Sequence, residues 1–282
     1  MCLSNRRFGR TNDQRNGHIS QGTDNKVYLK LNQMDRILAA FIFFTRLPFW
    51  KIKEITKDNY NHVVAYWPLV GWFTGGISFC TLWITAHFVP PSVAIIITLL
   101  VRICITGGLH EDGLADFCDG FGGQVNRERT LAIMKDSMIG SYGVMGLIFY
   151  FLLSYTVLST LPVELAALSL LIGDPYAKGV SSMIINRLPY ARKAEEAKNK
   201  ALYSPMTAKE VALAITCGGL PLFLLPHPLY LGALLLPILT WYGLTHWIKK
   251  RLQGYTGDCC GALTLLCELS FHLSIIILWT LF

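Results

Sequence analysis

Seven long apolar segments constrain this chain more than any other feature of its sequence. A bilayer core of about 30 Å needs roughly 20 apolar residues in a helix, and backbone groups in lipid must bond within their own segment. The composition agrees, because 52% of residues are hydrophobic and only 15% are charged, against roughly 25% charged in soluble domains. The sequence predicts an all-α, polytopic transmembrane bundle of about seven spans. They are residues 62–89, 92–109, 139–161, 163–185, 211–225, 229–248 and 262–282.

The basic residues predict the orientation of this bundle. Of the 25 Lys and Arg residues, 23 lie in the segments 1–57, 127–135, 187–209 and 249–251. Seven crossings place all four segments on one side of the membrane, and Lys and Arg mark the cytoplasmic side. We therefore expect a protein of the cell (inner) membrane with its N-terminus inside. The net charge of +7 is then a topology signal and does not indicate nucleic-acid binding.

Two regions are expected in the chain. Residues 1–33 are polar and lack an apolar run, which predicts a disordered tail and argues against a signal peptide. Residues 34–282 are predicted to form the integral membrane catalytic domain. Within it, residues 35–50 suit an amphipathic helix at the interface, and residues 186–209 suit a surface loop with some helix.

A crowded row of acids follows the second apolar segment. Glu111, Asp112, Asp116 and Asp119 fall within nine residues. In a helix, Asp112, Asp116 and Asp119 have the spacing i, i+4 and i+7, which places them near one face. Like charges at this spacing destabilise an isolated helix, so a cation is expected to offset them. Hard carboxylate oxygens suit Mg²⁺ or Mn²⁺ together with substrate phosphate.

Glycines and basic residues surround this acidic row. Glycines in the run 107–123 let the backbone approach a ligand closely. Arg127, Arg129 and Lys135 offer cations for phosphate, and Asp136 adds a carboxylate. Together they predict an acidic metal-binding loop or helix on the cytoplasmic side that holds a diphosphate. The alternative is a solvated loop with scattered charges.

A second polar island occupies residues 249–268. Asp258 is flanked by glycines at the inner mouth of the last span, on the same predicted side as the acidic row, so both could line one cavity. The alternative is that Thr256 or Asp258 caps the start of the last helix. Glu268 lies within the span, where an acid is functional or paired.

Three more polar residues within apolar segments are candidates for function. Arg102 could pair with Glu268 or reach a phosphate. Lys178 follows Asp174 at i+4, for which an internal ion pair is the simplest account. His110 adjoins the acidic row and could bind metal or a substrate hydroxyl, or it could serve packing alone.

Several segments resemble one known family, the cobalamin synthases, which are adenosylcobinamide-GDP ribazoletransferases. The resemblance covers residues 34–282 in the expected order, and Met138 occupies a place where the family commonly has Arg. The CDP-alcohol phosphotransferases share only the opening of the acidic motif, and membership of that group is not supported. The resemblance rests on segments 45–48, 66–71, 107–123, 133–137, 139–143 and 254–262.

The resemblance implies a reaction and its components. α-Ribazole, or its 5′-phosphate, attacks the cobinamide-linked phosphate of adenosylcobinamide-GDP and releases GMP, with Mg²⁺ required and Mn²⁺ as a substitute. The expected partners are these two substrates and the lipid bilayer. A homo-oligomer or association with other cobamide-assembly enzymes is compatible with the sequence.

The resemblance also implies roles for the candidate residues. The three aspartates of the acidic row would hold one or two Mg²⁺ ions in a clamp. Glu111 would be a further ligand or a base, and Asp136 would bind metal or orient the ribazole hydroxyl. Lys135, Arg127 and Arg129 would hold the leaving GMP. Asp258 and Glu268 would complete the second wall, and the remaining substrate-binding candidates are Arg102 and His110.

Two other functions remain open on the sequence. Another Mg²⁺-dependent membrane phosphotransferase, acting on a nucleotide-diphosphate-activated lipid or isoprenoid, would use the same acidic row and differ in its products. A secondary transporter would place ions on the intramembrane charges. Transporters usually show repeated halves, and this chain has no internal repeat.

Overall fold

The part of the chain that the structure describes is helical. The computed structural model describes residues 21–192 and 203–281, with side chains from residue 33 onward. Within these ranges, the β pairing consists of one isolated bridge between Tyr190 and Tyr255. The helices are α1 (Gln21–Phe44), η1 (Phe49–Lys51), α2 (Lys57–Tyr60), η2 (Val63–Tyr66), α3 (Trp67–Thr85), α4 (Pro91–Thr106), α5 (Leu109–Gly122), α6 (Arg127–Ile133), α7 (Ser141–Thr160), α8 (Val163–Ser182), α9 (Ile184–Arg187), α10 (Ala208–Gly219), η4 (Leu220–Leu224), η5 (Pro228–Leu234), α11 (Leu235–Leu252) and α12 (Gly257–Leu281).

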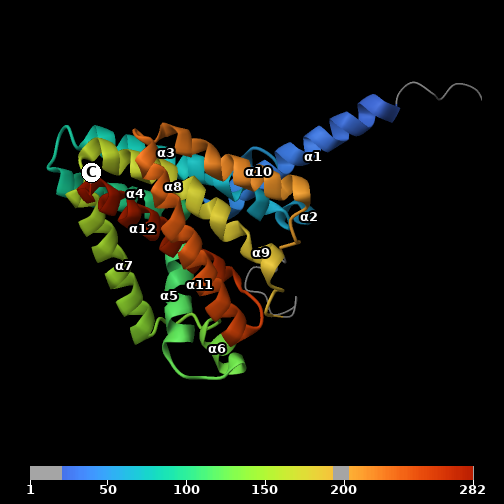
Figure 1. Cartoon of the computed structure of the whole chain (residues 1–282). Coiled ribbons are helices and arrows are strands. Elements are labelled where there is room, and N and C mark those ends of the chain that lie inside the picture. The colour runs from blue at the N-terminus through green and yellow to red at the C-terminus, as the bar shows by residue number, and fades with distance from the viewer. Residues whose placement is uncertain (1–20, 193–202, 282) are drawn as a thin grey trace, which may run out of the picture.

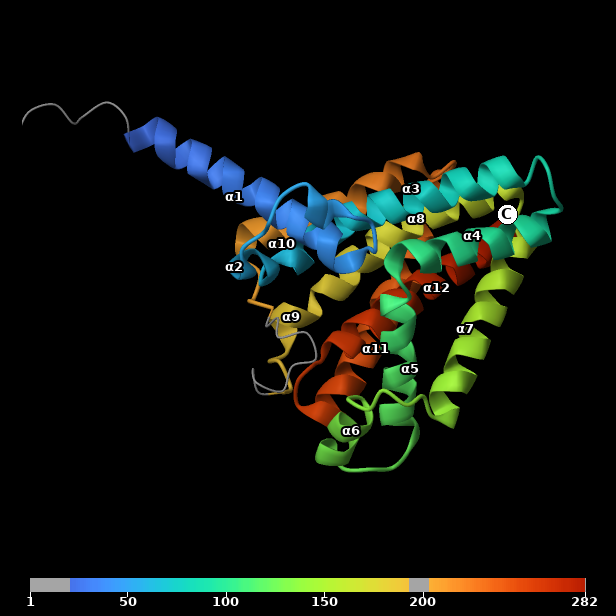
Figure 2. The ribbon, with the colours of Figure 1, turned by 180° about the vertical axis from the view of Figure 1, so that it is seen from behind.

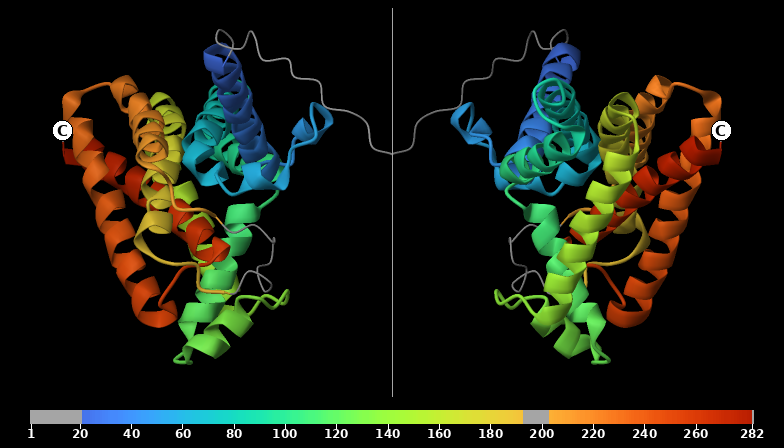
Figure 3. Two further views of the ribbon diagram at one scale, coloured as in Figure 1. Left: turned by 90° about the vertical axis from the view of Figure 1, so that its right-hand side faces the viewer. Right: turned by 90° about the vertical axis from the view of Figure 1, so that its left-hand side faces the viewer.

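Helix α12 is the central element of the bundle. It packs against α5, α8 and α11, and most of its first five turns are buried, polar residues included. Figures 1 and 2 show α12 running obliquely through the body, with α1 projecting from one end. Helix α6 lies at the opposite end of the body from α1 (Figure 3). The two acids of α12, Asp258 and Glu268, are therefore carried by the largely buried part of this helix.

Small residues allow α3 to lie directly against α8. A Cβ atom added at Gly71 would come within 2.5 Å of the Pro175 Cα atom, and one at Gly75 within 2.9 Å of the Leu170 carbonyl oxygen. Helix α3 is unbroken from Trp67 to Thr85. Its glycines therefore serve close helix packing, as small residues do between membrane helices.

A sharp bend separates α4 from the acidic helix α5. The two helices meet at 91°, and the joint consists of Gly107 and Gly108, with φ of 69° and 67°. Both values lie in the left-handed region, which glycine enters without the steric penalty of a Cβ atom. Of the two forms considered for the acidic row, loop or helix, the structure has the helix, and it begins directly at the end of an apolar helix.

Several helices are long and apolar enough to cross a bilayer. They are Val63–Thr85, Ser141–Thr160, Pro228–Leu252 and Gly257–Leu281, with the bent pair α4 and α5 as a fifth. These four to five candidate spans indicate an integral membrane protein. Predicted spans 92–109, 163–185 and 211–225 do not qualify individually: α4 has 16 residues and α10 has 12, and α8 carries Asp174 and Lys178. The count of seven and the orientation stay predictions.

The N-terminal region differs from the expected disordered tail. Helix α1 begins at Gln21, so the structure continues the helix through residues 21–33, where the sequence predicts disorder. Extending a helix that already exists orders one residue for each added hydrogen bond, which is far easier than starting a new one. Residues 1–20, which carry the rest of that prediction, lie outside the described residues.

Candidate active site

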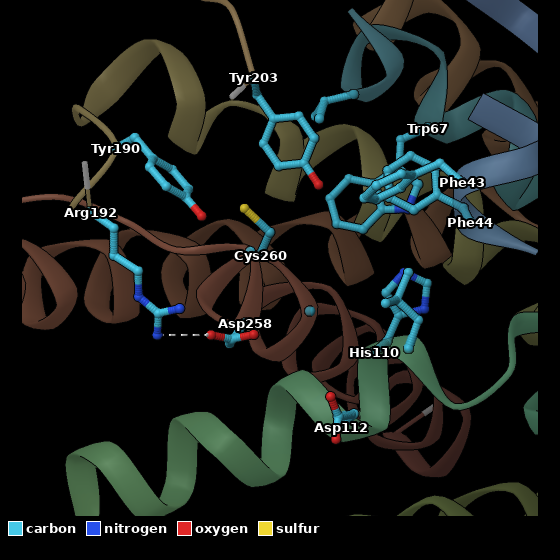
Figure 4. Close-up of a pocket in the computed structure, with 14 residues that line it drawn as sticks. Phe43, Phe44, Trp67, His110, Asp112, Tyr190, Arg192, Tyr203, Asp258 and Cys260 are labelled. Carbon is cyan, nitrogen blue, oxygen red and sulfur yellow. Dashed lines mark ion pairs between the residues drawn. The ribbon is translucent and has the colours of Figure 1, made fainter. Parts of the chain in front are cut away.

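A pocket opens between the first turns of α5 and of α12. The end of α1 and the segments around Tyr190 and Tyr203 close its other sides (Figure 4). Three sequence-predicted residues, His110, Asp112 and Asp258, line it together, although Asp258 lies far from the other two in the sequence. The full lining comprises Phe43, Phe44, Val64, Trp67, Leu109, His110, Asp112, Tyr190, Arg192, Tyr203, Gly257, Asp258, Cys260 and Gly261.

Two glycines bring α5 and α12 together at the pocket. A Cβ atom at Gly113 would lie 3.1 Å from the Asp258 carbonyl oxygen, and one at Gly261 would lie 3.2 Å from the His110 carbonyl oxygen. A larger side chain at either position would push the helices apart. These glycines therefore explain why His110 and Asp112 can face Asp258 across one pocket.

The segment after α11 places an arginine beside Asp258. Tyr255 donates its N–H to the Pro189 carbonyl at 2.9 Å, and Ala191 donates its N–H to the Tyr255 carbonyl at 2.8 Å. Gly254 is required for this pairing, because a Cβ atom there would lie 2.7 Å from the Pro189 carbonyl oxygen. Arg192 directly follows Ala191, and its guanidinium is held 3.8 Å from the Asp258 carboxylate.

Sequence reasoning missed Arg192. The segment 186–209 is predicted to be a surface loop, yet the Arg192 side chain is only 3% exposed. Its Nη2 donates to the Leu131 carbonyl at 3.3 Å, and its buried Nε has no partner among the described residues. The charges of the segment suggested a loop exposed to solvent, and they gave no sign that Arg192 is buried. Its neighbour Tyr190 is also partly buried, and burial raises the pKa of its hydroxyl to about 12.

Aromatic rings form the opposite wall of the pocket. Phe44 and Trp67 stack with ring centroids 5.0 Å apart, and Trp67 lies 5.5 Å from the His110 ring. His110 is buried, and its Nε2 has no hydrogen-bond partner among the described side chains and backbone. Figure 4 shows these rings at one end of the pocket and Arg192 with Tyr190 at the other.

The three aspartates of the acidic row do not act as one set in this structure. Asp112 is exposed and lines the pocket, whereas Asp116 is largely buried and makes a contact of its own. Asp119 accepts the N–H groups of Gly140 at 2.7 Å and Gly143 at 2.8 Å. It thus caps the N-terminus of α7, where a negative charge is stabilising.

The glycines of the segment 139–143 are explained by this cap. A Cβ atom at either Gly140 or Gly143 would lie 2.5 Å from an oxygen of the Asp119 carboxylate. Glycine is needed there because the backbone of α7 must approach the carboxylate. The motif therefore serves the attachment of α7 to α5.

No cluster of three His, Cys, Asp or Glu side chains able to hold a metal ion is present within the described ranges. The prediction that Asp112, Asp116 and Asp119 hold one or two Mg²⁺ ions stays a prediction. In this structure Asp119 is engaged by two backbone amides about two helical turns beyond Asp112, whereas the sequence spacing reports only a shared helix face.

Arg102 and Glu268 form a buried pair away from the pocket. Both guanidinium Nη atoms contact the two carboxylate oxygens of Glu268, with Nη1 to Oε1 at 2.5 Å. Their side chains are 5% and 1% exposed. His272 lies 3.6 Å from the same carboxylate. Of the two alternatives for Arg102, the structure favours pairing over phosphate contact, and Glu268 does not line the substrate pocket.

Two other buried groups lie nearby. Asp174 and Lys178 form the expected i, i+4 ion pair, and Thr74 on α3 donates its hydroxyl to Asp174 at 2.5 Å. This prediction is confirmed. Glu111 is 7% exposed, its Oε2 has no partner in the described part of the chain, and it is absent from the pocket lining.

The basic residues predicted to hold a phosphate lie at the far end of α5, around α6. Arg127 donates from Nε to the Leu252 carbonyl and from Nη2 to the Ala191 carbonyl, both at 2.7 Å. Arg127 and Lys135 line a surface groove that also includes Arg192. Arg129 is exposed on α6. Arg127 thus braces the segment that carries Arg192.

Asp136 and Thr256 have local roles in the backbone. Asp136 is exposed and accepts the Met138 N–H at 3.1 Å, so it does not reach the pocket. The Thr256 hydroxyl accepts the Cys259 N–H at 3.4 Å at the start of α12. The cap considered for this helix is therefore present, and it leaves the Asp258 side chain within the pocket wall.

Comparison with known proteins decides the family. The family model described as cobalamin-5-phosphate synthase matches residues 36–276. The chain belongs to the cobalamin-5-phosphate synthase family. A relative from Shewanella amazonensis, named adenosylcobinamide-GDP ribazoletransferase, is 35% identical over 255 residues, which cover 88% of this chain and 97% of the relative.

Other relatives agree with this match. A protein of the same name from Shewanella baltica is 36% identical over 244 residues, covering 84% of this chain and 92% of the relative. One from Shewanella pealeana is 34% identical over 249 residues, covering 87% and 96%. No solved structure matches the chain. The resemblance predicted from the motifs is thus confirmed over nearly the whole chain.

Proposed function

We propose that this protein is an adenosylcobinamide-GDP ribazoletransferase. A hydroxyl of α-ribazole, or of its 5′-phosphate, attacks the cobinamide-linked phosphorus of adenosylcobinamide-GDP. The bond from that phosphorus to the bridging oxygen breaks, and GMP leaves with that oxygen. The products are adenosylcobalamin, or its phosphate, and GMP. The family match and the names of the relatives support this reaction.

The pocket supports the same chemistry through its charges. Two carboxylates, Asp112 and Asp258, and one buried guanidinium, Arg192, line a single pocket. Phosphoryl transfer depends mainly on positioning and on compensation of phosphate charge. In this pocket Arg192 would position a substrate, and Asp112 with Asp258 would hold the cation that compensates the charge of the reacting phosphate. The meeting of Asp112 with Asp258 and Arg192 is the observation that carries the proposal.

The donor set fits a divalent cation that arrives with its substrate. Mg²⁺ is usually bound by one or two carboxylates together with substrate phosphates and water. Asp112 on the pocket wall and Asp116 one turn further along α5 would hold it, with Asp258 facing them; Mn²⁺ would use the same oxygens. Bound there, the metal would neutralise the charge on the diphosphate oxygens. Asp112 and Asp258 would also orient the attacking hydroxyl.

The orientation and the partners are part of the proposal. The basic segments predict that the N-terminus is cytoplasmic, and the pocket would then open toward the cytoplasm of a cell with this protein in its inner membrane. The leaving GMP would be bound by Lys135 and Arg129. Lys135 lies in the groove that Arg192 also borders. Association with a second copy or with other cobamide-assembly enzymes is compatible with this arrangement.

The test is an assay of membranes that contain the protein. Membranes are incubated with adenosylcobinamide-GDP, α-ribazole and Mg²⁺, and GMP and cobamide are measured. We expect both products in equal amounts and no CMP or pyrophosphate, with loss of activity on addition of EDTA. Absence of GMP and cobamide from folded protein would refute the proposed reaction.

Asp112→Asn should lower kcat by roughly 100- to 1000-fold, which is the usual cost of removing one group that acts on developing charge. Asp112 is exposed, so the variant should accumulate in the membrane as the wild type does. Asp35→Asn is the matched control, because Asp35 lies outside the pocket and pairs with Lys53. Near-normal kcat in Asp112→Asn would remove Asp112 from the site.

A further inference from the structure

The two ends of the pocket present complementary chemistry. Phe44, Trp67 and His110 form an apolar aromatic wall at one end, and Arg192 with Tyr190 forms a cationic and hydrogen-bonding end (Figure 4). Three buried nitrogens of this lining, His110 Nε2, Trp67 Nε1 and Arg192 Nε, have no partner among the described residues. Buried polar groups are normally satisfied, so all three point to a ligand.

The aromatic end fits a largely apolar, planar ring that offers an acceptor and no donor. Offset stacking on Phe44 and Trp67 would bury the ring faces. In its Nε2–H tautomer, His110 would donate one hydrogen bond to the ring nitrogen. The dimethylated benzimidazole of ribazole has this character: it carries methyl groups, no ring N–H and one free nitrogen. Guanine, by contrast, presents several donors, for which these three side chains offer no matching set of acceptors.

The other end fits a phosphate. Arg192 is 3% exposed at its side chain, and a guanidinium binds phosphate through two parallel N–H donors. Its contact with Asp258 is long, at 3.8 Å, which leaves donor capacity on the guanidinium. The Tyr190 hydroxyl is protonated at neutral pH and remains a donor, and burial raises its pKa further, to about 12.

We propose that this pocket is the acceptor subsite, with the ribazole base against Phe44, Trp67 and His110 and the 5′-phosphate of the acceptor on Arg192. This inference rests on the proposed function. It places the ribose between the two ends, beside Asp112 and Asp258, where a ribose hydroxyl would meet the donor's phosphate. It also assigns Arg192 a role in choosing a phosphorylated acceptor over free α-ribazole.

The backbone around Arg192 is built to hold it there. Arg127 binds the Ala191 carbonyl at 2.7 Å, and the Ala191 N–H binds the Tyr255 carbonyl at 2.8 Å. The segment is thus fixed to both α6 and the start of α12. A guanidinium whose main chain is attached on both sides can contact an acceptor phosphate with little loss of entropy on binding.

The test compares two acceptors in purified full-length protein with saturating adenosylcobinamide-GDP and Mg²⁺. In the wild type, we expect a lower KM for α-ribazole 5′-phosphate than for α-ribazole. In Arg192→Gln, the KM for the phosphorylated acceptor should rise about 10- to 100-fold, as expected for a lost charge-assisted contact, while the KM for α-ribazole changes less than about threefold. Arg192→Lys should recover part of the difference. Arg187→Gln, which alters an exposed arginine of α9, should leave both values unchanged.

Each other outcome has a defined meaning. Equal losses with both acceptors in Arg192→Gln, complete inactivity included, would overturn the phosphate assignment. A higher KM for adenosylcobinamide-GDP with unchanged acceptor constants would move Arg192 to the donor side and also overturn it. Wild-type protein that releases no GMP with either acceptor would instead refute the proposed reaction, so the two failures are distinguishable.

Discussion

Two arginine–carboxylate pairs involve the same helix, α12, and differ in almost every respect. Arg102 and Glu268 are both buried, and the guanidinium contacts both oxygens of the carboxylate. Arg192 and Asp258 are 3.8 Å apart, and Asp258 lies on the pocket wall. In the tight pair each buried charge is balanced by the other, so the pair contributes to the fold. The loose pair lies at the wall of the pocket, where a ligand can reach both side chains.

The difference follows from the surroundings of each pair. Charges removed from water require close pairing, because an unpaired buried ion is strongly destabilising. Glu268 therefore takes Arg102 in a bidentate contact and also lies 3.6 Å from His272. Asp258 is 14% exposed at its side chain and borders the pocket, where a substrate or metal can approach it.

Breaking the tight pair should have the largest effect. Glu268→Gln leaves the Arg102 guanidinium buried without a counter-charge, and we expect a loss of about 3–5 kcal/mol in the free energy of unfolding. The measurement is thermal unfolding of the purified protein in detergent, with the amount in the membrane as a second readout.

A double variant provides the control for this prediction. Arg102→Met combined with Glu268→Leu removes both charges, and it should be more stable than Glu268→Gln alone. If Glu268→Gln unfolds at the wild-type temperature yet loses activity, Glu268 belongs to the chemistry, as the sequence first suggested.

Breaking the loose pair should reverse the pattern of effects. Asp258→Asn should lower the free energy of unfolding by less than Glu268→Gln does, because the contact with Arg192 is long, at 3.8 Å, and Asp258 is partly exposed. It should lower kcat about 100-fold, since the carboxylate faces the reacting groups in the proposed site. Unfolding and GMP release are measured on the same preparation. A destabilised variant with normal kcat would make this pair structural as well.

Asp119→Asn should have the smallest effect of these variants. It distinguishes a role of Asp119 in capping α7 from a role as a metal ligand. The variant loses the charge that binds the Gly140 and Gly143 amides, which should cost about 1–2 kcal/mol of stability. The melting temperature and kcat are measured together. If kcat is lost and the melting temperature does not change, Asp119 is a metal ligand, as its spacing predicts, and the cap is secondary.

Local patterns in the sequence were sufficient for several of these conclusions. The spacing of Asp174 and Lys178 predicts their ion pair, and the structure contains it. The acids at 112, 116 and 119 have the spacing that places them near one face if the segment is helical, and α5 spans them. Both depend only on the 3.6-residue turn of a helix, which is a property of neighbouring residues.

The sequence predicts seven spans, whereas four to five segments of the structure qualify as candidate spans. Hydropathy counts apolar residues in a window, and it does not register where a helix ends or bends. Gly107 and Gly108 turn the chain by 91° after α4. The segment 211–225 is divided between the 12-residue α10 and a short 3₁₀ turn.

The sequence by itself determined the family, the helical class and the clustering of chemistry near Asp112 and Asp258, because motifs and hydropathy are written along the chain. Only the tertiary structure decided which of those charges meet. In that structure Arg102 pairs with Glu268, the Asp119 carboxylate accepts backbone N–H groups at the start of α7, and Arg192 lies beside Asp258. These contacts join residues far apart in sequence, and they depend on how closely helices pack at glycines such as Gly113 and Gly261.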